Sequence, residues 1–212
     1  MNQYLEITNL KSDVTMRDIE ALCDEAVKNN YAAVCVAPYY VTLASSLLKG
    51  TSVEVATVIG DEKGYQTTSV KSYEAIEAVQ NGATEIGMRI NLCALKNGDF
   101  EYIQEEIEEI RDSIDGKTLK VMVDVSKLTE EELVKIVRIC NETFIHYIEV
   151  VNEQSDSIST ILEHKGEVLE IKLNGIEPKE ALTIIEKGIS RIGTENGNLF
   201  MEGDVKWNYL MN

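Results

Sequence analysis

Leu119-Lys120-Val121-Met122-Val123-Asp124-Val125 is a run of β-branched and apolar residues, and Thr129-Glu130-Glu131-Glu132 follows it closely. The run predicts a buried β-strand. The Thr-x-x-Glu pattern predicts a helix start, with acidic residues where the helix dipole favours them. Leu133, Ile136 and Val137 then recur at helical spacing. This stretch therefore predicts one strand followed by one helix.

The same order repeats along the chain. Strands are expected at Tyr4–Leu10, Ala32–Ala37, Val53–Gly60, Glu85–Ile90, Leu119–Val125, Tyr147–Val151, Val168–Leu173 and Ser190–Thr194. Helix signals lie between them, at Thr15–Asp18, Asn81-Gly82, Phe100–Ile114 and Lys187-Gly188. Strands separated by helices pair in parallel through right-handed crossovers. We therefore predict an α/β fold, a (β/α)8 TIM barrel forming a single domain over residues 1–212, with an open doubly wound sheet as the alternative.

The composition and the absence of common motifs make several classes of function improbable. The 20 basic and 37 acidic residues give a net charge of −17, which disfavours binding to nucleic acid or to a membrane surface. The N-terminus lacks the features of a signal peptide, and no apolar run is long enough to span a membrane, so we expect a cytoplasmic protein. Dinucleotide, P-loop, zincin and hydrolase motifs are absent, and we expect no cofactor.

The four cysteines lie at positions 23, 35, 93 and 140. No pair has the CxxC spacing, and His146 and His164 are the only histidines that could join them at a metal site. We interpret the cysteines as buried, reduced thiols.

Seven further stretches occur in a fixed order: Ala33–Val41 (AVCVAPYYV), Thr57–Gly60 (TVIG), Glu85–Asn91 (EIGMRIN), Ala94–Asp99 (ALKNGD), Lys120–Val125 (KVMVDV), Leu128–Glu132 (LTEEE) and Arg191–Thr194 (RIGT). Together they resemble the deoxyribose-phosphate aldolase family, collinearly from about Tyr4 to Gly197. The resemblance implies a TIM barrel related to class I aldolases. In that family one lysine forms a Schiff base with the aldehyde, a second lysine tunes it, an aspartate relays protons, and late loops hold the phosphate.

The catalytic positions differ from that pattern. The Schiff-base lysine of the sixth strand corresponds to Glu149, and a carboxylate cannot form an imine. The aspartate of the fourth strand corresponds to Gly87, which carries no titratable group. The acidic position of the first strand is kept as Glu6, and Lys172 matches the second lysine. The resemblance thus marks Lys172, Glu149 and Glu6 as candidate catalytic residues, and Arg89 joins them because it shares a face of the fourth strand with Gly87.

The phosphate loops differ as well. The family's Ser-Gly-Gly-Ile-Arg loop corresponds to Asn174–Glu177 (NGIE), its Ser-Ser-Gly to Glu195–Gly197 (ENG), and its Gly-Phe-Pro-Leu-Gly to Gly60–Gly64 (GDEKG). Glu177 and Glu195 would oppose a phosphate dianion. The candidate substrate-binding residues are Asn152, Asn174, Gly175, Thr194, Asn196 and Gly197.

Alternation along the strands predicts that Gly87 and Arg89 share one face. If the family's catalytic positions face inward, as the resemblance implies, Glu149, Arg89 and Lys172 also point into the barrel. We predict that Glu149 lies within ion-pair distance of Lys172 or Arg89. One interpretation is purely structural: the ion pair of Glu149 neutralises charges that are buried in the barrel interior. The other is that Arg89 or Lys172 binds a small carboxylate or carbonyl compound, with Glu149 as general base.

Two further interpretations remain open. Lys172 could itself form the Schiff base, since burial lowers a lysine pKa, although Glu149 would stabilise the ammonium. Alternatively Glu6, Asp124, Glu149 and Asn152 supply oxygen ligands for a divalent cation at an acidic mouth.

The sequence leaves two classes of function: a homologue that has lost aldolase chemistry and binds a small-molecule ligand or a protein partner, or an enzyme with altered or residual aldolase chemistry. The tail Asp204–Asn212, with Trp207 and Tyr209, is interpreted as docking on the barrel or covering an oligomer contact such as that of a homodimer.

Overall fold

Eight parallel strands close into a barrel in which each strand pairs with its neighbours in sequence and β8 pairs with β1. The structure is a computed structural model that describes residues 2–60, 62–152 and 156–202. The strands are β1 (Leu5–Asn9), β2 (Ala33–Val36), β3 (Glu54–Ile59), β4 (Glu85–Arg89), β5 (Thr118–Asp124), β6 (Tyr147–Val151), β7 (Glu170–Asn174) and β8 (Arg191–Thr194). The predicted (β/α)8 barrel is confirmed, and the open sheet is wrong.

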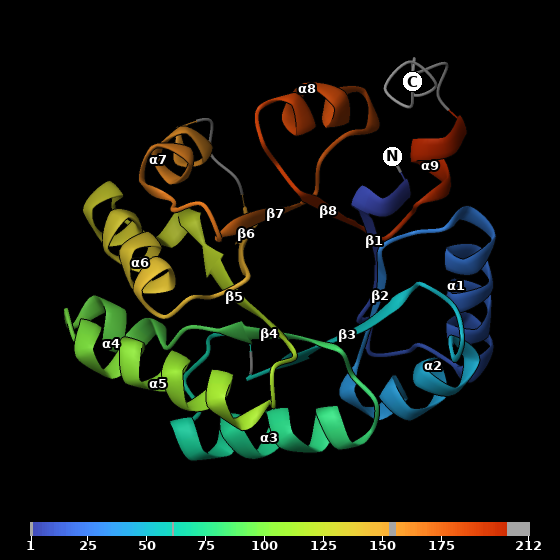
Figure 1. Cartoon of the computed structure of the whole chain (residues 1–212), viewed down its shortest axis with the longest axis horizontal. Helices are drawn as coiled ribbons and strands as arrows, with labels where there is room; N and C mark the ends of the chain where they lie inside the picture. Colours follow the sequence, from blue (N-terminus) through green and yellow to red (C-terminus); the bar gives the residue numbers. More distant parts are fainter. Residues whose placement is uncertain (1, 61, 153–155, 203–212) are drawn as a thin grey trace.

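The helices form a ring outside the strands (Figure 1). They are α1 (Met16–Asn29), α2 (Val41–Leu47), α3 (Thr68–Gln80), α4 (Leu92–Lys96), α5 (Phe100–Ser113), α6 (Glu130–Glu142), α7 (Ser157–His164), α8 (Ala181–Glu186) and α9 (Asn198–Glu202). Thr15 and Thr129 form the expected capping boxes at the starts of α1 and α6. Asn81 and Lys187 cap the C-terminal ends of α3 and α8, as their sequence predicted.

Strand alternation separates an apolar outer layer from a polar interior. On β4, Ile86 and Met88 are fully buried in the hydrophobic core, whereas Glu85 makes ion pairs with side chains from β5 and β8. On β6, Ile148 and Val150 belong to the same core. The residues between them, which carry the candidate site, consequently point into the barrel.

The cysteines follow the prediction with one exception. Cys23, Cys35 and Cys140 are buried, but Cys93 is exposed. Cys93 lies in the first turn of the short helix α4, whose buried position is Leu95. The apolar run around Cys93 therefore belongs to a helix of which only one face is buried. The expectation of a buried thiol is wrong at Cys93.

In the described part of the chain, no helix combines the length and the apolar composition that crossing a membrane requires. Trp207 and Tyr209 lie outside the described residues. The docking of the tail and the formation of a homodimer stay predictions.

Candidate functional site

A cavity of about 390 Å³ opens at the C-terminal ends of the barrel strands. Its lining consists of Thr8, Leu10, Cys35, Val58, Arg89, Met122, Glu149, Val151, Lys172, Asn174, Gly175, Gly193, Thr194 and Glu195. A larger groove of about 570 Å³, lined by residues of α7 and α8, contains none of the candidate site residues. Because loops at the C-terminal face build the active sites of this fold, the mouth cavity is the candidate site.

The structure brings most of the sequence-predicted residues to this cavity. Arg89, Glu149, Lys172, Asn174, Gly175 and Thr194 line it. Glu6 does not line it, but is fully buried and bonded to Lys172. The interior orientation expected for these side chains is therefore confirmed.

Three predicted binding residues are not among those that line the cavity. Asn152 is exposed, and its side chain bonds to Asp124. The backbone N–H of Asn196 donates to Thr194 Oγ1, 3.1 Å away. Gly197 lies against Tyr31, so closely that a Cβ atom would come within 2.6 Å of the tyrosine oxygen. Asn152 follows β6, and Asn196 and Gly197 follow β8. The binding role expected of these three residues stays a prediction.

Glu6 is the centre of the buried charges. Its Oε1 lies 2.5 Å from Lys172 Nζ, and its Oε2 lies 2.5 Å from Lys120 Nζ. Arg191 Nη1 approaches the same Oε2 at 3.3 Å. One carboxylate from β1 thus contacts cations from three other strands, which barrel closure alone brings together.

Glu149 forms the predicted ion pair with Lys172. Its Oε1 lies 3.0 Å from Lys172 Nζ and accepts a hydrogen bond of 2.8 Å from Asn174 Nδ2. Glu149 and Lys172 are register partners on the neighbouring strands β6 and β7. Since register partners in a parallel pair point to the same side, both side chains enter the barrel next to each other.

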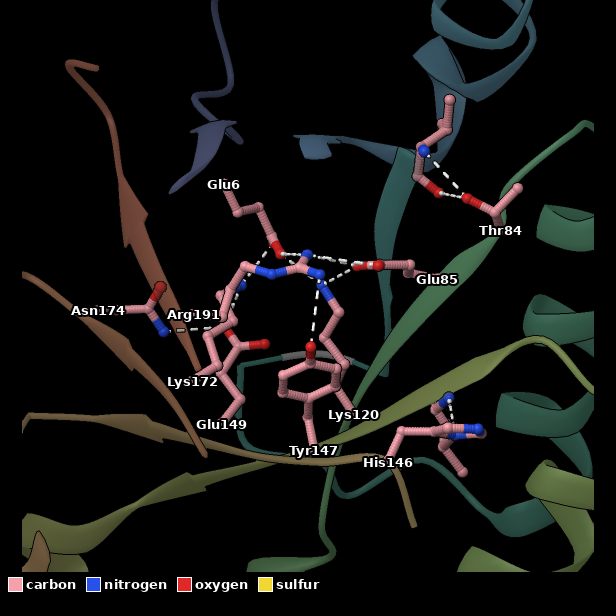
Figure 2. A network of polar contacts seen from close by, with 12 residues as sticks. Glu6, Thr84, Glu85, Lys120, His146, Tyr147, Glu149, Lys172, Asn174 and Arg191 are labelled. Carbon is pink, nitrogen blue, oxygen red and sulfur yellow. Dashed lines mark hydrogen bonds and ion pairs between the residues drawn. The ribbon is translucent and has the colours of Figure 1, made fainter. Parts of the chain in front are cut away.

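Figure 2 shows that these contacts belong to one network. Lys120 Nζ also lies 2.5 Å from Glu85, and Arg191 contacts Glu85 at 3.1 Å and the hydroxyl of Tyr147 at 3.5 Å. Three carboxylates (Glu6, Glu85, Glu149) and three cations (Lys120, Lys172, Arg191) therefore balance one another. The sequence analysis did not single out Glu85, Lys120 or Arg191, although strand alternation could have placed all three on the inward face.

The network fixes the protonation of its members. Burial on its own would lower the pKa of Lys172, but the carboxylates of Glu149 and Glu6 outweigh it and hold the pKa well above its ordinary value. Burial would likewise raise the pKa of Glu6, but Lys120 and Lys172 outweigh it and the pKa is lowered. Lys172 is consequently an ammonium and Glu6 a carboxylate at neutral pH.

Arg89 differs from these cations. It is half-buried, its side chain lines the cavity, and within residues 2–60, 62–152 and 156–202 its guanidinium has no ion-pair or hydrogen-bond partner. The prediction named Lys172 or Arg89 as the partner of Glu149, and the structure gives that place to Lys172. Arg89 therefore presents its positive charge to the cavity.

The acidic residues of the phosphate loops are placed unequally. Glu195 lines the cavity and pairs with the exposed Lys11 at 3.1 Å. Glu177 is exposed and precedes the short 3-10 helix Pro178–Glu180, without lining the cavity. Only Glu195 therefore has the position expected of both acids. Asp61, in the loop after β3, lies outside the described residues.

The proposed set of cation ligands does not assemble. Three cations surround Glu6, and Asp124 is engaged with Ser126 and Lys127. Among the residues that the structure describes, no group of three or more His, Cys, Asp or Glu side chains could hold a metal ion. The interpretation based on a divalent cation was therefore wrong for these four residues.

Replacing Glu6 by Gln is expected to lower the free energy of unfolding by about 3–5 kcal/mol at neutral pH, because it leaves buried cations uncompensated. The lowered pKa of Glu6 means that this contribution is complete above the ordinary carboxyl pKa of about 4.3 and decreases as the pH falls below it. Urea unfolding of both proteins at neutral pH and at about pH 3.5 measures the difference.

The matched control for that substitution is Glu131→Gln, which removes an exposed carboxylate 3.2 Å from Lys135 and should change stability little. An equal effect of the two substitutions, or a difference that does not shrink in acid, would contradict the role of Glu6.

The sequence model of the DeoC/LacD family aldolases matches residues 3–134 of this chain. The deoxyribose-phosphate aldolase of Metamycoplasma hominis is 41% identical over 181 residues, which cover 82% of this chain and 83% of that protein. The deoxyribose-phosphate aldolase of Finegoldia magna is 35% identical over 211 residues, covering 96% and 99%.

Solved structures agree with these relatives. The structure described as QR15, an aldolase, superposes with a TM-score of 0.90 at 32% identity, covering all of this chain and 98% of the other. A structure from Coccidioides immitis, described as that of a putative deoxyribose-phosphate aldolase, has a TM-score of 0.86 at 27% identity, covering 93% of this chain and 82% of the other.

Proposed function

The chain belongs to the DeoC/LacD family of aldolases, and from that premise we propose that its barrel mouth binds a small carboxylate-bearing ligand without forming a Schiff base. The observation that carries this proposal is the position of Lys172 Nζ between Glu6 and Glu149, 2.5 Å and 3.0 Å away. An imine requires an unprotonated amine. Two buried carboxylates keep this amine protonated.

The loss of the family chemistry is supported at a second position. Gly87 faces the interior, where a Cβ atom would lie 3.2 Å from Met122 Sδ and 3.6 Å from a methyl carbon of Val58. Both of those residues line the cavity. The strand position that carries the family's proton-relay acid therefore holds no group that could move a proton.

The cavity itself supports the ligand class. Arg89 contributes a positive charge without a described partner, and Asn174 and Thr194 contribute polar groups on the other side of the barrel. A guanidinium binds a carboxylate through two parallel hydrogen bonds. Leu10, Met122 and Val151 add apolar surface, and the acidic residues Glu149 and Glu195 also line the cavity. These features suit a small organic acid.

Glu149 could add chemistry to binding. Its Oε1 is used by Lys172 and Asn174, whereas its second oxygen has no dashed contact among the residues drawn in Figure 2. A carboxylate that lines the cavity and keeps one oxygen available can act as a general base toward a bound acid.

An aldolase that uses Lys172 is the second candidate. It is favoured by relatives named deoxyribose-phosphate aldolase at 35–41% identity and by the position of Lys172, the one lysine lining the mouth cavity in the described part of the chain. In that case Lys172 would have to lose its proton to Glu6 or Glu149 before attacking the aldehyde.

Small carboxylates test the proposal. Acetate, glyoxylate and malonate are expected to raise the melting temperature of the wild-type protein, and at least one should do so at millimolar concentration. The Arg89→Ala variant should lose this shift, whereas Arg138→Ala, which removes an exposed arginine on α6, should keep it. The absence of a shift with all three acids, or an unchanged shift in Arg89→Ala, would contradict the proposed ligand class.

A further inference from the structure

A second buried ion pair lies outside the barrel network, between the helices α3 and α5. Lys71 Nζ lies 2.8 Å from Glu106 Oε1, and both side chains are completely shielded from solvent. The two helices pack side by side and cover the same side of the barrel (Figure 1). Neither residue contributes to the mouth cavity or to the network around Glu6.

Stability alone does not explain this pair. Burial lowers the pKa of Lys71 and raises the pKa of Glu106, although each group has the other as a partner. In addition, Glu106 Oε2 is buried without a hydrogen-bond partner among the described residues. Apolar residues of similar size often replace such pairs with no loss of stability.

The pair is bonded to the end of β4. Lys71 Nζ donates to the backbone carbonyl of Arg89 at 2.9 Å, and the backbone N–H of Asn91 lies near the Glu106 carboxylate and favours its charged form. Lys71 therefore holds the peptide group that precedes Ile90, and Glu106 holds Lys71. This is the point where the chain leaves the barrel and the Arg89 side chain enters the mouth.

The loop after β3 reinforces this attachment. Gly60, the first residue after β3, lies against the Lys71 side chain, since a Cβ atom there would be 3.4 Å from Lys71 Cε. Gly64 lies directly on the end of β4, where a Cβ atom would be 2.1 Å from the carbonyl oxygen of Ile90. Lys71 consequently fills the space between this loop and the Arg89 carbonyl.

We propose that Lys71 and Glu106 are positioning residues that fix the Arg89 guanidinium at the barrel mouth. This inference rests on the proposed function, because that function is what makes Arg89 important. The contacts that hold Arg89 in place do not depend on it. Lys71 acts through the Arg89 carbonyl, and Glu106 acts by holding Lys71. Neither side chain reaches the ligand.

The test measures Arg89 directly. An arginine-selective dicarbonyl, phenylglyoxal, is applied to the intact protein, and peptide mass spectrometry follows the modification rate of Arg89 relative to the exposed Arg17. The variant is Lys71→Met/Glu106→Gln, which removes both charges together and keeps side chains of similar size. We expect Arg89 to react several-fold to roughly tenfold faster, the factor that corresponds to the net contribution of one ordinary hydrogen bond.

Two controls separate positioning from stability. Lys135→Met/Glu131→Gln removes an exposed pair on α6 and should leave the Arg89 rate unchanged. Ile136→Val shortens a buried side chain on the same helix and lowers stability without contacting β4. An Arg89 rate that stays at the wild-type value, that falls, or that rises equally in Ile136→Val would overturn the proposal.

A second measurement on the same samples tests this inference separately from the proposed function. Malonate should protect Arg89 from phenylglyoxal in the wild-type protein, and about tenfold more malonate should be needed in Lys71→Met/Glu106→Gln. Faster modification without any protection of the wild-type protein would support the positioning role and refute the ligand class. Protection of both proteins at the same malonate concentration, with equal rates, would overturn the positioning role alone.

Discussion

Incubated with 2-deoxyribose 5-phosphate, this protein is expected to release no glyceraldehyde 3-phosphate above background. The amine closest to the reacting position, Lys172, is an ammonium held by Glu6 and Glu149. Gly87 supplies no acid, and Glu195 faces the cavity where the phosphate would approach. Loss of a catalytic nucleophile alone lowers kcat by a factor on the order of 10⁴–10⁶.

The measurement is a coupled assay for glyceraldehyde 3-phosphate, run with the wild-type protein beside Lys172→Ala. Turnover that disappears in the variant would contradict the account and make Lys172 the catalytic lysine. Turnover of the same size in both preparations would indicate a contaminating enzyme. Robust turnover that depends on Lys172 would also show that Glu195, which already pairs with Lys11, does not exclude a phosphate.

The substitution Glu149→Lys is expected to create an amine that forms an imine. The new side chain would start from β6 next to Lys172, so two amines would compete for the carboxylate of Glu6. A like charge at this distance lowers the pKa of one of them and so favours the nucleophilic form. Acetaldehyde followed by borohydride should therefore add one ethyl group, which peptide mapping should locate at position 149.

Glu149→Gln is the matched control for that variant. It removes the same carboxylate and leaves no amine at position 149, while Lys172 keeps its 2.5 Å contact with Glu6. We expect no adduct in this control. A control that is trapped at Lys172 would show that Glu149 alone keeps this amine unreactive, and a Glu149→Lys protein that is not trapped would contradict the equivalence of position 149 with the family lysine.

Local sequence patterns predicted most of the fold. The capping boxes at Thr15 and Thr129 depend on residues three apart, and alternation within β4 and β6 depends on residues two apart. These are interactions within one element, so the sequence carries them directly. The exposure of Cys93 could not be predicted in the same way, because the orientation of a helix as short as α4 depends on the strand end that precedes it.

The candidate site was predictable only in part. The pair formed by Glu149 and Lys172 follows from neighbouring strands, and its prediction is confirmed. The contacts of Glu6 with Lys120 and Arg191 join residues 114 and 185 positions apart, and no local pattern indicates them. Arg89 was named as the alternative partner of Glu149, but the register of the barrel gives that place to Lys172 and leaves the Arg89 guanidinium facing the cavity.

Reduction of the wild-type protein with borohydride in the presence of acetaldehyde, read by intact mass, tests the central claim most directly. The claim is that Glu6 and Glu149 hold Lys172 as an ammonium, so that the mouth of this barrel contains no amine able to form an imine. The account predicts a protein of unchanged mass at neutral pH under conditions that trap Glu149→Lys. A wild-type protein that gains one ethyl group, mapped to Lys172, would contradict it.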